Sequence, residues 1–174
     1  MLMWYVVQVF TGDELKIADR LNHEVRRGDE QVFVPLFERR KSIRGEWTKV
    51  TTPLFPGYIF IQTDDIENMH LRIRKLNVFT KVLKTGDIYT PISEEEEEFL
   101  RNLIGEDHVA RQSVGIIEGD KVIVMEGPLY GLEGNIIKIN RHKRIAIIKA
   151  DFMGGPREIK VGLEIIDKKP AKND

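Results

Sequence analysis

A cluster of cations late in the chain contains the residues best suited to bind a ligand. From Asn135 to Lys149 there are five lysines and arginines, one histidine and no acidic residue. Such side chains neutralise phosphate groups, so the cluster predicts an RNA-binding edge, although a solvated turn between two strands is the alternative. The candidate contact residues, extended by two later cations, are Lys138, Arg141, His142, Lys143, Arg144, Lys149, Arg157 and Lys160.

A second group of cations lies in residues 38–52. Arg39, Arg40, Lys41 and Arg44 precede a single glycine, and Lys49 follows it. This pattern predicts a long polar hairpin whose tip is Arg44-Gly45-Glu46. Two interpretations stay open: a solvated excursion, or a basic finger that contacts the backbone of DNA or RNA.

The stretch from Pro53 to Ile61 is the strongest candidate for a protein-binding surface. Its prolines favour an extended entry, and Tyr58 to Ile61 is typical of a strand with two apolar faces. One interpretation is a central strand covered on both faces. The other is an exposed apolar patch of Phe55, Tyr58 and Phe60 that docks a partner.

Composition argues against catalytic and metal chemistry. The net charge is -1, so no global basic field is present, and there is no cysteine for a thiol nucleophile or a thiolate site. The four histidines are scattered without ligand spacing. The acidic run at 94–98 fits a helix start better than a cation site, because consecutive helical residues point in different directions. We therefore expect no enzyme activity, no metal and no cofactor.

The first part of the chain predicts an α+β domain over residues 1–104. Strands are expected at 4–10, 32–35, 58–61 and 78–83, and helices at 14–26, 64–75 and 93–104. Asp64-Asp65 starts the second helix, and Ser93 with Glu96 forms a capping box for the third. This order favours a mostly antiparallel sheet with flanking helices.

The rest of the chain predicts a small β-barrel behind a linker. In residues 105–114 the apolar residues follow neither the helical nor the strand period, so this segment is expected to form a flexible linker. Residues 115–167 contain short strands between glycine turns, which is typical of a barrel of about five strands. Residues 168–174 are expected to be a disordered tail. No signal peptide or membrane-spanning run is evident, so a cytosolic protein without membrane contact is expected.

Two motifs resemble a known family. Gly127 to Ile139 resembles a KOW motif, the strand–turn–strand element of SH3-like barrels. The runs Trp4-Tyr5-Val6-Val7-Gln8 and Phe55-Pro56-Gly57-Tyr58 are similar to the amino-terminal (NGN) domain of NusG-type transcription elongation factors. The resemblance covers Trp4 to about Ile166.

This resemblance implies that the first domain binds the clamp helices of RNA polymerase through an apolar pocket, close to upstream or non-template DNA. Carried onto this sequence, the pocket corresponds to Phe55, Tyr58 and Phe60, with Tyr5 and Gln8 as weaker candidates. The expected protein is a monomer.

The KOW region departs from the pattern of the general factor. Leu129-Tyr130-Gly131-Leu132 and residues 151–157 replace that factor's phenylalanine-rich turn and Ile-Phe-Gly-Arg-like run. The chain is closer in look to the specialised LoaP paralogues, which prevent termination in selected long operons and recognise an RNA hairpin in the leader transcript. The alternative is a general elongation factor whose barrel binds a ribosomal or termination protein.

Overall fold

The computed structural model describes residues 1–172, which group into two units. The first unit consists of Met1–Pro35 and Phe55–Glu98. The second consists of Leu36–Leu54 together with the chain from Phe99 onward. The hairpin that interrupts the first unit in sequence is therefore grouped with the carboxy-terminal half, a different division from the one expected at residue 104.

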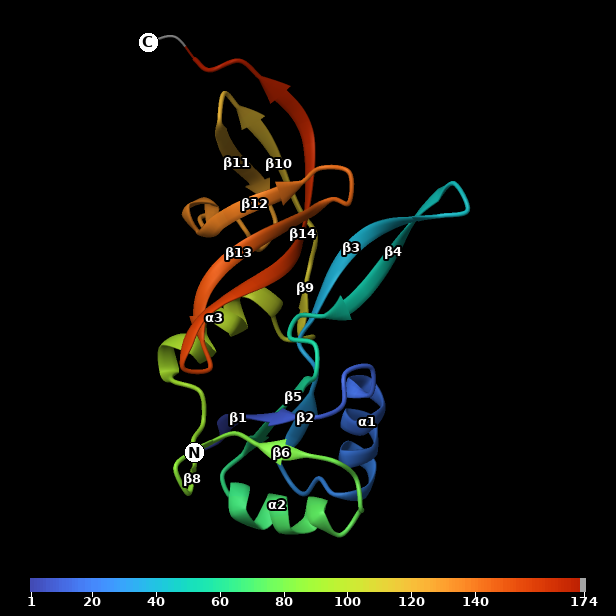
Figure 1. The fold of residues 1–174 in the computed structure, drawn as a ribbon, viewed down its shortest axis with the longest axis vertical. Coiled ribbons are helices and arrows are strands. Elements are labelled where there is room, and N and C mark those ends of the chain that lie inside the picture. Colours follow the sequence, from blue (N-terminus) through green and yellow to red (C-terminus); the bar gives the residue numbers. More distant parts are fainter. Residues whose placement is uncertain (173–174) are drawn as a thin grey trace. The chain divides into compact units, whose positions relative to one another are not determined.

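The first unit is built on a four-stranded antiparallel sheet (Figure 1). Its strands are β1 (Met3–Gln8), β2 (Gln31–Phe33), β5 (Tyr58–Thr63) and β6 (Lys81–Val82), in the order β2-β5-β1-β6. Val6 is paired with Phe60 and Val7 with Ile59. The strand expected at 78–83 is thus shorter, whereas the antiparallel sheet is confirmed.

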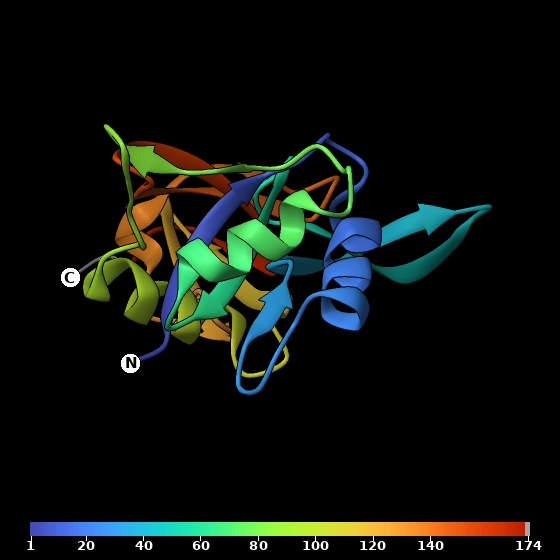
Figure 2. The same cartoon turned by 90° about the horizontal axis from the view of Figure 1, so that it is seen from below.

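Two helices cover one face of this sheet. Helices α1 (Glu14–Glu24) and α2 (Ile66–Arg74) bury Leu21, Met69 and Ile73 completely. Figure 2 shows α2 in front of the sheet, with α1 beside it. The side chain of Asp65 accepts a hydrogen bond from the amide of Asn68 at 3.1 Å, so the expected helix start is confirmed.

The remaining elements of this unit follow α2. Strands β7 (Lys84–Thr85) and β8 (Ile88–Tyr89) form a small hairpin. Helix α3 (Glu94–Ile104) starts with the predicted capping box, in which Ser93 and Glu96 exchange two 3.1 Å hydrogen bonds. The boundary between the two units falls within α3, after Glu98.

The second unit contains the basic hairpin. Strands β3 (Leu36–Ile43) and β4 (Glu46–Pro53) are antiparallel, and β9 (Val109–Ala110) adds to β3 in parallel. Arg44 and Gly45 form the turn, with φ values of 52° and 82°. Positive φ at both central positions is typical of the tight turns that match the twist of a hairpin, so the predicted tip is confirmed.

Apart from the end of α3, the rest of the second unit is the barrel expected from the sequence. Its five strands are β10 (Ser113–Glu118), β11 (Lys121–Glu126), β12 (Ile136–Asn140), β13 (Ile145–Phe152) and β14 (Gly155–Lys169), in the order β11-β10-β14-β13-β12. A short 3-10 helix, η1 (Glu133–Asn135), precedes β12. Leu129, Ile148, Phe152 and Val161 are buried.

The hairpin and the barrel meet at a glycine. A Cβ built on Gly162 of β14 would lie 2.3 Å from the carbonyl oxygen of Glu38 on β3. Gly162 does not have a positive φ, so its lack of a side chain serves this close approach of two backbones rather than an unusual conformation.

Two sequence-based expectations for this region are corrected. Residues 105–114 do not lack regular structure, because they include β9 and the start of β10. The pairing of Val109 and Ala110 with β3 depends on residues far away in sequence, which no local period reveals. The tail was expected to begin at residue 168, but β14 extends to Lys169. Residues 173 and 174 of the expected tail lie outside the described residues.

Candidate nucleic-acid and protein interfaces

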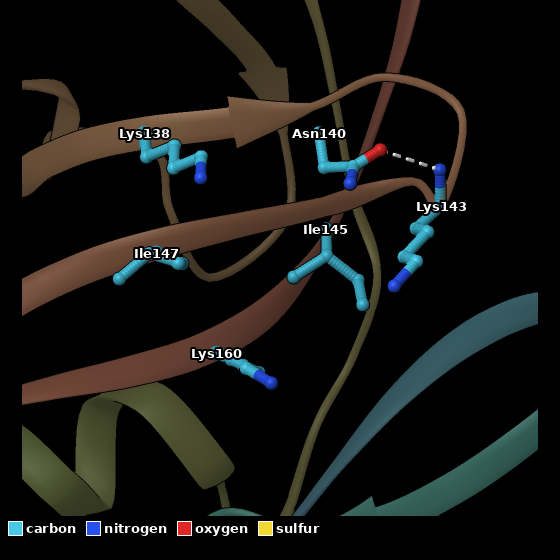
Figure 3. A pocket seen from close by; sticks show the side chains of 6 residues that line it. All are labelled: Lys138, Asn140, Lys143, Ile145, Ile147 and Lys160. Atoms are coloured by element: carbon cyan, nitrogen blue, oxygen red, sulfur yellow. Dashed lines mark hydrogen bonds between the residues drawn. The ribbon is translucent and has the colours of Figure 1, made fainter.

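Three of the predicted cations line one shallow cavity on the barrel, which we call the basic hollow. Its volume is about 130 Å³, and its lining residues come from β12, β13, β14 and the 141–144 turn (Figure 3). Lys138 and Lys160 flank Ile147, because both are its register partners on the neighbouring strands. None of the described residues that line it is acidic; they are Lys138, Asn140, Lys143, Ile145, Ile147 and Lys160.

The turn beside the hollow has a fixed geometry. The side-chain oxygen of Asn140 accepts a 2.9 Å hydrogen bond from the amide of Lys143, shown as the dashed line in Figure 3. Such Asn side chains stabilise tight turns by binding the backbone further along the chain. The chain turns at residues 141–144, and Arg141, His142 and Lys143 are exposed on this turn.

Arg144, at the end of this turn, makes contacts inside the second unit. Its guanidinium carbon lies 3.7 Å from the ring centroid of Trp47, and one of its nitrogens lies 3.7 Å from a carboxylate oxygen of Glu164. Its carbonyl accepts a 3.0 Å hydrogen bond from the amide of Leu163. Arg144 therefore joins the barrel turn to Trp47, which lies on strand β4 of the basic hairpin. The sequence did not indicate this role.

The other two predicted cations lie away from the turn. Lys149 is paired in register with Glu158, which places an opposite charge across from it on the same face of the sheet. Arg157 is paired with Ala150 and donates a 3.2 Å hydrogen bond to the carbonyl of Phe152, at the other end of the β13–β14 hairpin. The predicted set of eight thus divides between the hollow, its turn and two outlying positions.

The cations of the hairpin are arranged by its register. Arg40 is paired with Lys49 and Ser42 with Trp47, so Arg40, Lys49 and Trp47 lie on one face of the hairpin. Arg39 and Lys41 occupy the other face, and Arg44 lies in the turn. Glu38 is buried on the same face as Arg40 and Lys49, where Arg111 donates a 2.9 Å hydrogen bond to it and Lys49 lies 3.8 Å away.

The exposed patch expected from Phe55 and Phe60 is not present. Phe60 is 0% exposed and Phe55 is 6% exposed. The ring of Phe60 lies 5.8 Å from that of Phe55, 5.6 Å from Phe33 and 6.4 Å from Trp4. The physical reason is that these aromatic rings pack together into core, which leaves neither phenylalanine available at the surface.

The remaining residues of the predicted pocket occupy two faces. Gln8 and Tyr58 are paired directly across β1 and β5, and both are half-buried. Tyr5 lies on the opposite face because side chains alternate along a strand. It is 8% exposed, and burial raises its pKa above the ordinary value of 10.0. Only Gln8 and Tyr58 therefore retain surface on the face that the prediction needed.

The structure reveals an aromatic pair that the sequence reasoning missed. Phe10 and Phe79 are stacked with ring centroids 4.5 Å apart, although they are 60% and 48% exposed. Both lie close along the chain to Gln8 and Lys81, which are themselves paired across β1 and β6. The signal in the sequence was weak, because Phe10 and Phe79 lie within the strands expected at 4–10 and 78–83, where aromatic residues are typical.

Two histidines have depressed proton affinity. Burial, with the nearby charges of Arg74 and Lys84, lowers the pKa of His70 below 6.5. Its Nδ1 lies 2.6 Å from the hydroxyl of Tyr89. Burial also lowers the pKa of His108, an effect opposed by Asp107 and aided by Arg101. Neither histidine belongs to a cluster suited to a metal ion, and residues 1–172 contain no such cluster.

Comparison with known proteins settles the family. The model described as "Transcription termination factor nusG" matches residues 2–101, and that of the KOW motif matches residues 118–149. The chain belongs to the NusG family. NusG proteins are transcription factors rather than enzymes, in agreement with the expectation from composition. Within residues 1–172, no helix is long and apolar enough to cross a membrane.

Similar proteins span nearly the whole chain. The NusG termination/antitermination protein of Pasteurella multocida is 26% identical over 172 residues, which cover 95% of this chain and 94% of that protein. The NusG of Halalkalibacterium halodurans is 27% identical and covers 92% and 94%. A structure of Thermotoga maritima NusG, described as a study of domain interaction, is 18% identical with a TM-score of 0.57 and covers 95% and 94%.

Proposed function

We propose that this NusG-family protein prevents transcription termination in selected long operons, as LoaP-type paralogues do. In this proposal the first unit binds RNA polymerase, and the barrel binds an RNA hairpin in the leader of the transcript. The observation that carries the proposal is the basic hollow, where Lys138, Lys143 and Lys160 surround two isoleucines without an acidic neighbour in the lining. Such an arrangement suits the phosphates of a folded RNA.

The polymerase contact is assigned to the exposed end of β1. Phe10, two residues beyond β1, and Phe79 supply apolar area there, and Gln8 and Tyr58 lie at the adjacent ends of the two central strands, β1 and β5. Stacked rings that stay exposed in the free protein are typical of protein-binding surfaces, because their burial contributes about 25 cal/mol per Å². The clamp helices of the polymerase are the proposed partner, by analogy with the family.

Selectivity in this mechanism comes from joining two contacts in one chain. Binding of the barrel to a leader RNA raises the effective concentration of the first unit at the polymerase that made that RNA. The first unit then holds the clamp closed and disfavours pausing and hairpin-induced opening. Upstream or non-template DNA is a further proposed contact of the hairpin cations Arg39, Arg40, Lys41 and Arg44.

A general elongation factor is the second candidate, and one observation favours it. Met125 and Tyr130 of the barrel are 58% and 71% exposed, which suits a protein partner such as a ribosomal or termination protein. Tyr130 belongs to the loop between β11 and β12, away from the turn that carries Lys143. The two candidates therefore assign function to different parts of the barrel.

Gel-shift and pull-down experiments on the full chain distinguish the candidates. The substitutions Lys143→Glu and Lys160→Glu together should abolish retention of leader RNA while polymerase binding is unchanged. Met125→Ser with Tyr130→Ser is the matched control and should leave RNA retention intact. RNA retention that survives the two glutamates, together with capture of a ribosomal or termination protein that is lost in the control, would establish the general factor.

A further inference from the structure

Trp47 occupies an unusual place for a tryptophan. It lies on β4 of the hairpin and is 43% exposed, whereas Trp4, the other tryptophan of the chain, is 2% exposed in the core of the first unit. An indole ring contributes most to stability when it is buried. The exposed position of Trp47 therefore calls for another explanation.

Arg144 holds the ring of Trp47 in a defined orientation. Its guanidinium lies 3.7 Å from the ring centroid, which is a close cation–π contact. Arg144 is fixed in turn by Glu164 and by the hydrogen bond from Leu163 to its carbonyl. The close approach of Gly162 to Glu38 holds the hairpin against the same strand, β14. Arg144 thus covers one face of the Trp47 ring and orients it.

Trp47 lies among several cations and two acidic side chains, because Lys49 lies 3.8 Å from Glu38 and Arg144 lies 3.7 Å from Glu164. Arg40 and Lys49 are paired with each other on the same face of the hairpin, and Lys143 directly precedes Arg144 in the barrel turn. Cations suit phosphates, whereas the core of a protein–protein interface is depleted in charged residues. An exposed ring among cations is the arrangement by which proteins stack unpaired bases.

We propose that Trp47 is a stacking platform for an unpaired nucleobase in the loop of a bound RNA hairpin. Arg144 orients the ring, and the hairpin and the barrel turn thereby bind one RNA together. This inference rests on the proposed function, since it assigns the loop of the same RNA to Trp47 and its stem to the basic hollow. The hairpin thus contributes to recognition of the bases as well as of the backbone.

Two RNA probes test the stacking directly. The first is an RNA stem closed by unpaired adenines, and the second is the same stem closed by abasic nucleotides, which keep the phosphates but lack the bases. With the full chain at low ionic strength, Trp47→Ala should weaken binding of the adenine probe about tenfold and leave the abasic probe unaffected. Trp47→Phe keeps a smaller ring, so its affinity for the adenine probe should lie between those of the wild type and Trp47→Ala.

A matched control and a second readout complete the test. Ile43→Ala removes a side chain of the same 43% exposure from the opposite face of the hairpin and should leave both affinities unchanged. The adenine probe should also quench part of the tryptophan fluorescence of the wild-type chain, and the abasic probe should not. Wild-type affinity of Trp47→Ala for both probes overturns the stacking.

Three outcomes separate this inference from the proposed function on which it rests. An equal loss of affinity of Trp47→Ala for the two probes overturns base stacking, and reduces Trp47 to a support for Arg144. Failure of the wild-type chain to bind either probe overturns the proposed RNA binding itself. Normal binding of both probes by wild type and Trp47→Ala leaves the proposed function standing without the platform.

Discussion

Both carboxylate oxygens of Glu30 lie 2.9 Å from the same guanidinium nitrogen of Arg72 in the first unit. The hydroxyl of Thr63 donates a further 2.7 Å hydrogen bond to Glu30, and Arg72 also donates to the carbonyl of Val25. These bonds join α2 to β5, to the end of α1 and to the segment before β2. Glu30 is 7% exposed, so these partners offset the cost of burying its carboxylate.

Removal of this ion pair should destabilise the first unit strongly. Arg72→Met leaves a buried, uncompensated carboxylate and should lower the free energy of unfolding by about 3 kcal/mol. Urea denaturation followed by circular dichroism measures the change. Arg20→Met is the matched control, because Arg20 pairs with exposed Glu24 in α1 and should cost roughly 0.5 kcal/mol. Equal costs for the two variants would contradict the structural role given to Glu30.

The aromatic pair at the end of β1 should be required for binding to polymerase. Phe10→Ser with Phe79→Ser removes the stacked rings and should reduce retention of the chain on RNA polymerase at least about tenfold, given the apolar area lost. Leu15→Ser with Leu71→Ser is the control, since these helical side chains are 57% and 56% exposed. Polymerase binding that is weakened equally by both pairs would argue against a defined surface at Phe10 and Phe79.

Substitution of Phe55 should affect stability rather than polymerase binding, although the resemblance places this residue in the polymerase-binding pocket. Because Phe55 is buried against Phe60, Phe55→Ser should act through stability and lower the free energy of unfolding by about 3 kcal/mol. Thermal unfolding shows this loss, whereas Phe10→Ser should leave the midpoint within a few degrees. A fully stable Phe55→Ser variant that no longer binds polymerase would place Phe55 at the interface after all.

The close approach of the two backbones at Gly162 should depend on the missing side chain. In Gly162→Ala the added methyl group meets the carbonyl oxygen of Glu38, so the hairpin must move away from β14. Trypsin should then cleave at Arg40 and Lys41 faster than in the wild type. Gly155→Ala, at the start of the same strand, meets nothing within 4 Å and should not change the cleavage rate.

The sequence predicts local features better than pairings between distant segments. The hairpin tip at Arg44-Gly45, the cap at Asp65 and the capping box at Ser93 follow from neighbouring residues and are all present. The parallel pairing of Val109 with Leu36 and the contact of Arg144 with Trp47 join segments far apart, and no period encodes them. The burial of Phe60 likewise depends on Trp4 and Phe33 from other strands.

Stability should fall with acid because of two histidines. Their pKa values are lower in the folded chain than the ordinary 6.5, so the unfolded chain binds more protons below that pH. The contribution of these two histidines to the free energy of unfolding should therefore be constant above pH 6.5. It should decrease as the pH falls below 6.5. Titration of the histidine ring protons by NMR measures both values; a pKa at or above 6.5 for His70 would contradict the burial effect.

The central claim, that the barrel selects transcripts through its basic hollow, is tested most directly by crosslinking the full chain to RNA in the cell and sequencing the bound transcripts. The account predicts crosslinks concentrated in a small set of leader hairpins. These should be lost in the Lys143→Glu, Lys160→Glu variant, which should still copurify with polymerase. Crosslinks spread over all transcripts in proportion to their synthesis, and unchanged in that variant, would contradict it.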